Sequence, residues 1–480
     1  MFATRIALAA VVAVAGMAGF GSAAAAPGTA LDWRPCAENP VYECATLEVP
    51  IDWADPSGDT LGVALIRDRA EDPSARVGTL VSLPGGPGTS GVDQILNGTG
   101  LSEELRSRFD IVSLDPRGVK RSHPVRCDAG LFEGMFEGRP NLDPDHGGRL
   151  DEVHSYAREL ADSCRAHTGP LIDHVDAISV ARDVEALRLA LGESRITLYS
   201  RSYGTMPAQA YAELFPRNLR ASLLDSVDDH SLEGAEFLAT EARAGQDNFT
   251  EFASWCAATP ECALYGTDVH RTYRELFAAA QRGELANPNF PDRRLTPLAL
   301  STQVTQRFTG PDWPTLALEM RTLAERGPAI PQPPTRPVAT GKPAPAAQLI
   351  FCSDWRFDIA NQAVWQQLWR EQRSGAPTLG VHFAWGAASI CSGWPTPPAN
   401  PPHRPRIADG PALLVMNSRH DPSTPHEWAA HVAALTPRTT LLTYDGWGHI
   451  AYGRTACTRD AADRYLVDLR LPTVASCPAA

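Results

Sequence analysis

The chain has 480 residues, of which 43% are hydrophobic and 21% are charged, and it carries a net charge of -13 at pH 7. A strongly acidic balance argues against nucleic acid and against an anionic lipid surface as partners. The length exceeds what one hydrophobic core normally serves, so we expect a main domain and a subsidiary one.

The first 26 residues have the pattern of a secretory signal peptide. Arg5 is followed by an apolar run over residues 6–20 and then by small residues up to Ala26. The apolar run is too short for a comfortable membrane span, which argues against an N-terminal anchor. We expect cleavage near Ala24 or Ala25, and a mature protein that is secreted to the extracellular side without stable membrane association.

The ten cysteines of the chain agree with export. An even number of cysteines in an oxidising compartment usually forms disulfide bonds, although sequence alone does not fix which ones pair. The spacing favours five local pairs: Cys36–Cys44, Cys127–Cys164, Cys256–Cys262, Cys352–Cys391 and Cys457–Cys477. Neither Cys-x-x-Cys nor His-Glu-x-x-His occurs, so we do not expect a metal site.

The chain then alternates strand-like and helix-like segments. Strands are expected over 61–67, 79–83, 110–114, 196–200 and 221–225, and helices notably over 149–166 and 177–191. This alternation predicts an α/β fold with a mostly parallel sheet covered by helices on both faces. From about residue 228 to 404 the pattern changes to helical segments broken by proline-rich linkers at 329–334 and 395–402.

A glycine-rich loop follows the strand expected over 79–83. It contains Pro84, Gly85, Gly86, Pro87 and Gly88. Glycines let a backbone pass close to a ligand and expose its N–H groups, which suits an oxyanion hole with Gly86 as one donor and Gly85 as the alternative. A plain turn is the other interpretation. The motifs of phosphate-binding loops are absent from this stretch.

Ser202 is the best candidate for a catalytic nucleophile. It lies in Ser200-Arg201-Ser202-Tyr203-Gly204, between an apolar run over 196–199 and a helix-like segment that starts at Thr205. A serine in such a strand-to-helix turn is typical of a nucleophile elbow. Small residues are needed two positions before and after the serine, so Ser200, where glycine is usual, is a mild departure. The N–H of Tyr203 is the second expected oxyanion donor.

Two further residues complete a candidate triad. Asp421 follows a buried strand expected over 412–417 and precedes an amphipathic stretch over 426–435. His449 follows a strand expected over 440–444, in a loop with glycines on both sides of Trp447. The order serine, acid, histidine along the chain is that of α/β-hydrolases. Asp115 and Arg117 precede the serine, so we expect them to hydrogen-bond the loops beneath it instead.

This order predicts an α/β-hydrolase fold with a helical cap inserted between the nucleophile strand and the acid strand. The expected division is a signal peptide over 1–26, a first part of the core over 27–227, a helical cap over 228–405 and a C-terminal part of the core over 406–480.

Several motifs together resemble one family. They are Leu83-Pro84-Gly85-Gly86-Pro87-Gly88, Asp115-Pro116-Arg117-Gly118, Ala181-Arg182-Asp183, Ser202-Tyr203-Gly204-Thr205, Cys391-Ser392-Gly393-Trp394-Pro395 and the Asp421 and His449 loops. Together they resemble the secreted bacterial tripeptidyl aminopeptidase family of α/β-hydrolases, which is proline iminopeptidase-like and has a TAP-like C-terminal region. The resemblance implies a serine exopeptidase that releases tripeptides from free N-termini, with Ser202 as nucleophile, His449 as base and Asp421 as orienting acid, and with no cofactor.

Three residues depart from the family pattern. Leu83 stands where Asn or His is usual, Ser200 replaces Gly in the elbow, and Lys120 replaces Gly after Asp115-Pro116-Arg117-Gly118. The first two are expected to touch the site and to alter the substrate. An esterase or a hydrolase that tailors peptide natural products is therefore the alternative with the same triad. A non-enzymatic binding protein on this scaffold is a third reading, supported only by Leu83 and Ser200.

An aminopeptidase also needs a carboxylate that recognises the substrate ammonium group. The expected cap offers Glu236, Glu241 and Asp354, and Asp354 is the best placed of them because neighbouring Cys352 pins its loop. For each of the three, an ordinary structural acid is the competing interpretation. The sequence leaves open the oligomeric state and the choice between a peptide and a small acyl substrate.

Overall fold

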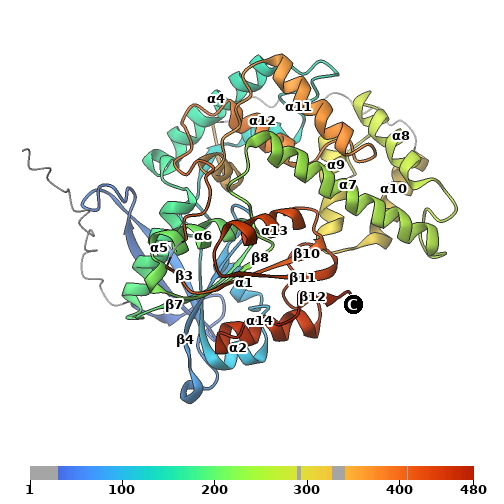
Figure 1. Ribbon diagram of the computed structural model, residues 1–480. Helices are drawn as coiled ribbons and strands as arrows, with labels where there is room; N and C mark the ends of the chain where they lie inside the picture. Colours follow the sequence, from blue (N-terminus) through green and yellow to red (C-terminus); the bar gives the residue numbers. More distant parts are fainter. Residues whose placement is uncertain (1–30, 289–292, 327–340, 408) are drawn as a thin grey trace, which may run out of the picture.

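The computed structural model describes residues 31–288, 293–326, 341–407 and 409–480, so the expected signal peptide and the linker at 329–334 lie outside the described residues. A ten-stranded sheet forms the centre of this part of the chain (Figure 1). In sheet order, the strands are β1 (Arg34–Pro35), β2 (Glu43–Pro50), β3 (Thr60–Asp68), β5 (Phe109–Leu114), β4 (Gly78–Leu83), β7 (Ile196–Arg201), β8 (Leu219–Asp225), β10 (Leu413–His420), β11 (Thr439–Trp447) and β12 (Ser476–Pro478).

The sheet is parallel from β5 to β12 and antiparallel from β1 to the β3–β5 pair. All seven strands expected from the sequence are present, within a few residues of the predicted bounds. The short edge strands β1 and β12 and the half-exposed strand β2 were not expected, because none of them forms the continuous apolar run of a buried parallel strand.

Successive residues of the central strands point to opposite faces, and both faces are buried. Val81 and Leu198 pack on one face with the helices α5 (Ala177–Ala190), α6 (Thr205–Leu214) and α13 (His426–Leu435). Leu80 and Tyr199, their neighbours in the chain, pack on the other face with α1 (Gly91–Leu96), α2 (Glu103–Arg108) and α14 (Ala456–Asp468). The expected α/β class is confirmed.

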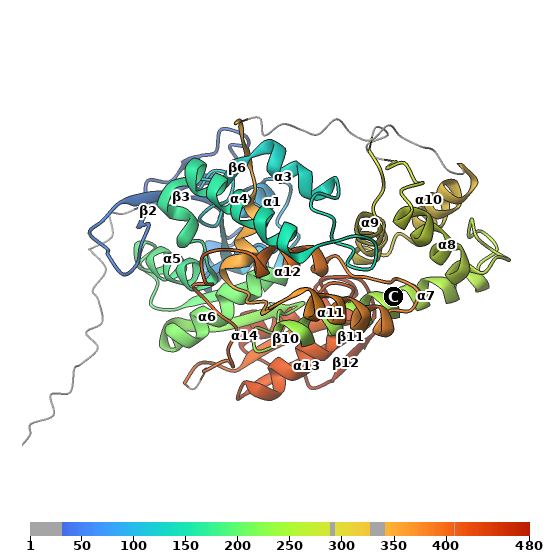
Figure 2. The ribbon, with the colours of Figure 1, turned by 90° about the horizontal axis from the view of Figure 1, so that it is seen from above.

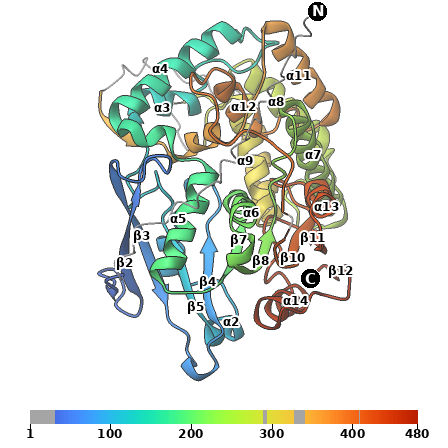
Figure 3. The ribbon, with the colours of Figure 1, turned by 60° about the vertical axis from the view of Figure 1, so that its left-hand side comes forward.

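A second, helical layer covers the end of the sheet into which the parallel strands run (Figure 3). Six of its helices lie between β8 and β10 in the chain: α7 (Gly234–Ala258), α8 (Val269–Gln281), α9 (Pro297–Thr309), α10 (Trp313–Arg326), α11 (Gln362–Gly375) and α12 (Ala384–Ser392). We call this layer the cap. The described helices include none that is long and apolar enough to cross a membrane.

The helix expected over 149–166 belongs to this cap and does not cover the sheet. It forms α4 (Leu150–Thr168), which lies beside α11 and α12 (Figure 1). Its His154 Nε2 lies 3.0 Å from Ser392 Oγ at the end of α12. The preceding helix α3 (Ala129–Phe136) follows β6 (Arg126–Asp128), which pairs with β9 (Pro343–Pro345). Two separate segments therefore build the cap, and the domain division at residue 228 stays a prediction.

The five expected disulfide bonds are all present. Two of them fasten the cap. Cys127–Cys164 joins β6 to α4, and Cys352–Cys391 joins the short 3-10 helix η5 (Ala347–Ser353) to α12.

Arg117 forms a buried ion pair with Asp183 below the loops at the carboxyl ends of the parallel strands, as expected. Its guanidinium is fully buried and binds both oxygens of Asp183 on α5, at 2.7 and 2.5 Å. It also donates to the backbone carbonyls of Pro50, Ile51 and His174. A buried guanidinium with this many acceptors ties β2 and α5 to the loop after β5, which makes its role structural.

We predict that Arg117→Ala lowers the free energy of unfolding by about 3–5 kcal/mol, because it leaves Asp183 buried without its partner. Urea unfolding with the disulfides intact measures this loss. The exposed pair Arg34–Asp32 provides the control, since Arg34→Ala should leave the unfolding midpoint unchanged. An Arg117→Ala protein as stable as the parent chain would contradict this role.

Candidate active site

Ser202 lies at the turn between β7 and α6, in a strained backbone conformation. Its φ is +53°, a value that non-glycine residues rarely adopt. A Cβ atom at Gly204 would lie 2.5 Å from the carbonyl oxygen of Pro84, and one at Gly85 would lie 2.9 Å from Ser202 Cβ. The glycine-rich loop thus passes directly against the serine turn, which is the geometry of a nucleophile elbow.

Asp421 follows β10 immediately, and its carboxylate is buried and fully hydrogen-bonded. It accepts hydrogen bonds from the N–H groups of Ser423 and Thr424, from Thr424 Oγ1 at 3.0 Å and from Ser226 Oγ at 2.8 Å. Both of its oxygens lie 3.0 Å from His449 Nδ1. The structure therefore brings together two of the three residues that the chain order predicts for a triad.

The loop that carries His449 is held by hydrogen bonds to residues at the end of β8 and directly after it. The N–H of Ile450, whose φ is +70°, donates to Ser226 Oγ at 2.8 Å. The next two N–H groups, of Ala451 and Tyr452, donate to the buried carboxylate of Asp225 at 2.7 and 2.9 Å. The backbone N–H of His449 itself donates to the carbonyl of Thr309, the last residue of α9. The end of β8 and α9 of the cap therefore hold the backbone on both sides of the imidazole in one conformation.

Asp421 and His449 shift each other's protonation. Burial alone raises the pKa of Asp421, but the charge of His449 and the surrounding hydrogen bonds outweigh it, so the pKa lies below its usual value. Burial alone lowers the pKa of His449, but the charge of Asp421 and their hydrogen bond raise it above 6.5. The pair is thus an ionised carboxylate beside an imidazole that protonates more readily than usual.

A cavity of about 620 Å³ joins the sheet edge to the cap. From the core, its walls include Gly85, Gly86, Ser202, Tyr203 and His449. From the cap, they include Phe237, Glu241, Gln306, Phe351 and Phe383. The nucleophile candidate, both oxyanion candidates and the imidazole therefore face one cavity, and the cap forms its opposite wall.

Two carboxylates in this cavity lack hydrogen-bond partners. Asp228, three residues after β8, and Glu241, on α7, are both buried. Asp228 Oδ2 and Glu241 Oε2 have no hydrogen-bond partner within the described part of the chain. Burial raises the pKa of Asp228 to about 7 and that of Glu241 well above its usual value. Buried acids whose oxygens the protein's own donors leave unsatisfied are typical of a binding site.

His382 does not supply the missing donor for Glu241. Its Nδ1 lies 3.3 Å from Glu241 Oε2 but accepts a hydrogen bond from the N–H of Ala384, while its Nε2 lies 2.9 Å from the carbonyl of Pro422. This arrangement fits a neutral imidazole whose lone pair faces the carboxyl group. Burial lowers the pKa of His382 to about 4, in agreement.

The preference for Asp354 among the cap acids is wrong. Its carboxylate is buried away from the cavity and accepts from the N–H of Ala177, from Asn400 Nδ2 and from the hydroxyl of Tyr203. Cys352 does pin its loop, to α12, but the Asp354 carboxylate faces α5 of the core. Glu236 is exposed, one turn before Glu241 on α7. Glu241 alone of the three lines the cavity, and Asp228 was missed although it follows a strand that ends at this edge.

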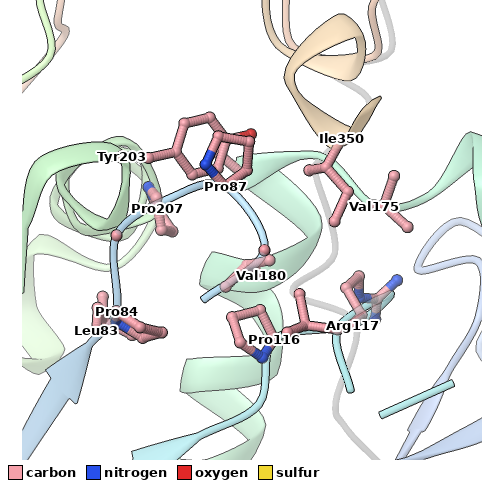
Figure 4. Close-up of a pocket in the computed structure, with 14 residues that line it drawn as sticks. Leu83, Pro84, Pro87, Pro116, Arg117, Val175, Val180, Tyr203, Pro207 and Ile350 are labelled. Carbon is pink, nitrogen blue, oxygen red and sulfur yellow. The ribbon is translucent and has the colours of Figure 1, made fainter. Parts of the chain in front are cut away.

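The expected departures from the family pattern do not reach the cavity either. Leu83 is buried under the glycine-rich loop, against a small space of about 20 Å³ that Pro116, Val175 and Ile350 also line (Figure 4). Ser200 is buried and donates to the carbonyl of Leu223 in β8. Lys120 pairs with Asp93 at the surface. None of the three is among the described residues that line the 620 Å³ cavity.

Comparisons with known proteins agree with this geometry. Residues 376–477 match the family model described as TAP-like protein. The chain is 29% identical to Serine protease Hip1 of Mycobacterium tuberculosis, over 92% of this chain and 89% of that protein. It is 26% identical to the Tripeptidyl aminopeptidase of Streptomyces lividans (93% and 86% covered) and 29% identical to Carboxylesterase B of M. tuberculosis (89% and 85% covered).

The sheet order, the serine turn and the Asp421–His449 pair define the chain as an α/β-hydrolase. Within that class its residues 376–477 resemble the TAP-like family, in agreement with the motifs, and the chain is a serine hydrolase.

We predict that Ser226→Gly lowers kcat about tenfold without lowering stability. Ser226 has a φ of +59°, where glycine is favoured, so glycine relieves strain while it removes the hydroxyl that joins Asp421 to the His449 loop. Steady-state kinetics and thermal unfolding of one preparation separate the two effects. Leu469→Gly is the matched control, because Leu469 is exposed and has a φ of +62° at the end of α14; it should leave kcat unchanged. Full activity in Ser226→Gly would show that the hydroxyl has no positioning role.

We also predict the acid limb of the pH profile. A base must be neutral to act, so kcat/KM should fall as the pH drops through the raised pKa of His449, with a midpoint above 6.5. Asp421→Asn removes the charge that raises this pKa and leaves burial, which lowers it, so the midpoint should move to lower pH while the rate falls by about 10⁴. The Asp228→Asn variant is the control: its pH profile should keep the acid limb, because His449 and not Asp228 is the group that titrates there. An acid limb that Asp421→Asn leaves in place would refute the assignment.

Proposed function

We propose that this protein is a secreted aminopeptidase that removes short peptides, tripeptides in the first instance, from free N-termini. The single observation that carries the proposal is the pair of buried, incompletely bonded carboxylates, Asp228 and Glu241, in the same cavity as Ser202 and His449. A substrate ammonium group supplies the hydrogen-bond donors and the positive charge that these two acids lack. A neutral ester has neither.

The proposed chemistry is acyl transfer through a covalent intermediate. His449 takes the proton of Ser202 as the hydroxyl oxygen attacks the substrate carbonyl carbon, and Asp421 stabilises the imidazolium that forms. The N–H groups of Gly86 and Tyr203 stabilise the oxyanion, each by about 3 kcal/mol. His449 then gives the proton to the leaving amine, and a water molecule hydrolyses the acyl-enzyme. Each step uses only groups of this chain and water.

The cap supports an exopeptidase over an endopeptidase. It narrows the space above Ser202 with Phe237, Phe351 and Phe383, and both carboxylates line the same cavity. A chain end fits into such a cavity, whereas an internal segment of a folded protein has to leave on both sides. The five disulfide bonds support secretion, since such bonds persist in oxidising compartments.

The test compares a chromogenic tripeptide amide that has a free N-terminus with its N-acetylated twin and with a short-chain ester. We expect cleavage of the free peptide, loss of activity in Ser202→Ala, and at least tenfold discrimination against the acetylated twin. Glu241→Gln and Asp228→Asn should each raise KM for the free peptide about tenfold, because a hydrogen bond to a charged group contributes about 1.5–3 kcal/mol. Stability should not fall, because each change removes an uncompensated buried acid.

Glu236→Gln is the matched control, since Glu236 lies on the same helix but is exposed; it should leave KM unchanged. Equal turnover of the free and the acetylated peptide would refute the ammonium site. Turnover of the ester alone would move the assignment to an esterase, the activity that the name of the Carboxylesterase B relative states.

A further inference from the structure

A second cavity opens from the reaction cavity and runs through the cap. Its volume is about 560 Å³, and its lining includes residues of α3, α9 and α12, three helices of the layer that Figure 2 shows from above. The two cavities share five lining residues: Gln306, Gln348, Phe351, Phe383 and Ala387. This second space therefore adjoins the reaction cavity, and we call it the side groove.

The walls of the side groove include large apolar side chains of α3 that the protein covers only in part, beside uncharged polar residues such as Thr302 and Gln303. The helix α3 has the sequence Ala-Gly-Leu-Phe-Glu-Gly-Met-Phe, yet only its two glycines are buried. Phe132 and Met135 are half-exposed, and Phe136 is 57% exposed. All three line the groove, opposite Leu298 and Ala299 of α9. An apolar helix of this kind normally buries its large side chains, so its exposed face points to a bound apolar group.

The charges of the side groove differ from those of the reaction cavity. Two arginines, Arg139 and Arg293, are the charged residues among its described lining, which includes no carboxylate. Both arginines pair with Glu137, at 2.6 and 3.2 Å. The groove therefore offers an apolar surface, while the two carboxylates Asp228 and Glu241 stay in the reaction cavity.

The mouth of the groove lies beside the carboxylate site. Phe383, at the mouth, follows His382, whose Nδ1 is 3.3 Å from Glu241 Oε2. Phe351, also at the mouth, lies with its ring centroid 5.9 Å from that of Phe237, one turn before Glu241 on α7. A substrate whose amino group is held by Glu241 thus places its N-terminal side chains at this opening. The disulfide Cys352–Cys391 lines the groove and fixes two of its walls to each other.

We propose that the side groove is a specificity pocket for a large apolar side chain within the N-terminal segment that the enzyme releases. One of the residues before the scissile bond then occupies the groove. Peptides with phenylalanine or leucine at this position are the preferred substrates, and peptides with Asp or Lys there are poor substrates. This inference rests on the proposed aminopeptidase function, because the direction of the substrate is set by the ammonium site.

The experiment measures kcat/KM for tripeptide amides with a constant leaving group, in which each position in turn is Ala, Leu, Phe, Asp or Lys. At one position we expect Phe or Leu to exceed Ala about tenfold, which is the gain from burying one large apolar side chain. Ala299→Trp, which fills the groove from α9, should bring this ratio close to one and leave tri-alanine hydrolysis within about twofold. Phe136→Arg, at an exposed position that tolerates a charge, should also lower the ratio.

Leu318→Arg is the control, because Leu318 is 49% exposed on α10 and does not line the groove; the ratio should stay unchanged. Calorimetric binding of the free tripeptides to Ser202→Ala gives the same comparison independently of turnover. If neither turnover nor binding shows a preference for Phe or Leu at any position, the proposal that the side groove is a specificity pocket is refuted. Equal turnover of tri-alanine amide and its N-acetylated twin would instead refute the aminopeptidase function, so the two failures are distinguishable.

Discussion

The site depends on one buried carboxylate, Asp421, that must stay ionised beside His449. Removal of a carboxylate from water costs several kcal/mol unless donors replace the water. The donors come from two N–H groups in its own turn, from Thr424 Oγ1 and from Ser226 Oγ, which follows β8. Because Ser226 also accepts from the loop after β11, one hydroxyl fixes the acid and the histidine at once. The register of β8, β10 and β11 is therefore part of the catalytic geometry.

The contrast between Asp421 and the acids of the cavity explains their different roles. Asp421 has its full set of donors and a lowered pKa, whereas Asp228 and Glu241 lack donors and have raised values. A carboxyl group whose pKa burial has raised gives up its proton more readily when an ammonium group lies beside it, because the positive charge favours the ionised form. Binding of a free N-terminus then adds little net charge to the cavity, which keeps the desolvation cost low. In the proposed mechanism the fully hydrogen-bonded acid orients the base, and the two incompletely bonded acids bind the substrate ammonium group.

The chain order predicts Ser202, Asp421 and His449 because each follows a strand and parallel strands end at one edge, and the structure brings Asp421 and His449 into contact. The five disulfides were predictable because all partners lie within forty residues of each other. The two acids proposed to bind the substrate, Asp228 and Glu241, were not predictable in this way. Whether Glu241 or Asp354 faces the cavity depends on how α7 packs against His382, a contact across more than a hundred residues. The place of α4 in the cap was hidden for the same reason, because its apolar face fits a sheet or another helix equally well.

The cap is a structural part of the nucleophile turn as well as its cover. Tyr203 follows the serine directly, and its hydroxyl donates to Asp354, a cap residue that also accepts from the N–H of Ala177 and from Asn400. Burial raises the pKa of Asp354 to about 7, and the three donors oppose that rise. The backbone N–H of the same Tyr203 is the proposed oxyanion donor. A shift of the cap would therefore pull on the residue that must stabilise the transition state, so access of the substrate and activation of the carbonyl depend on one set of contacts.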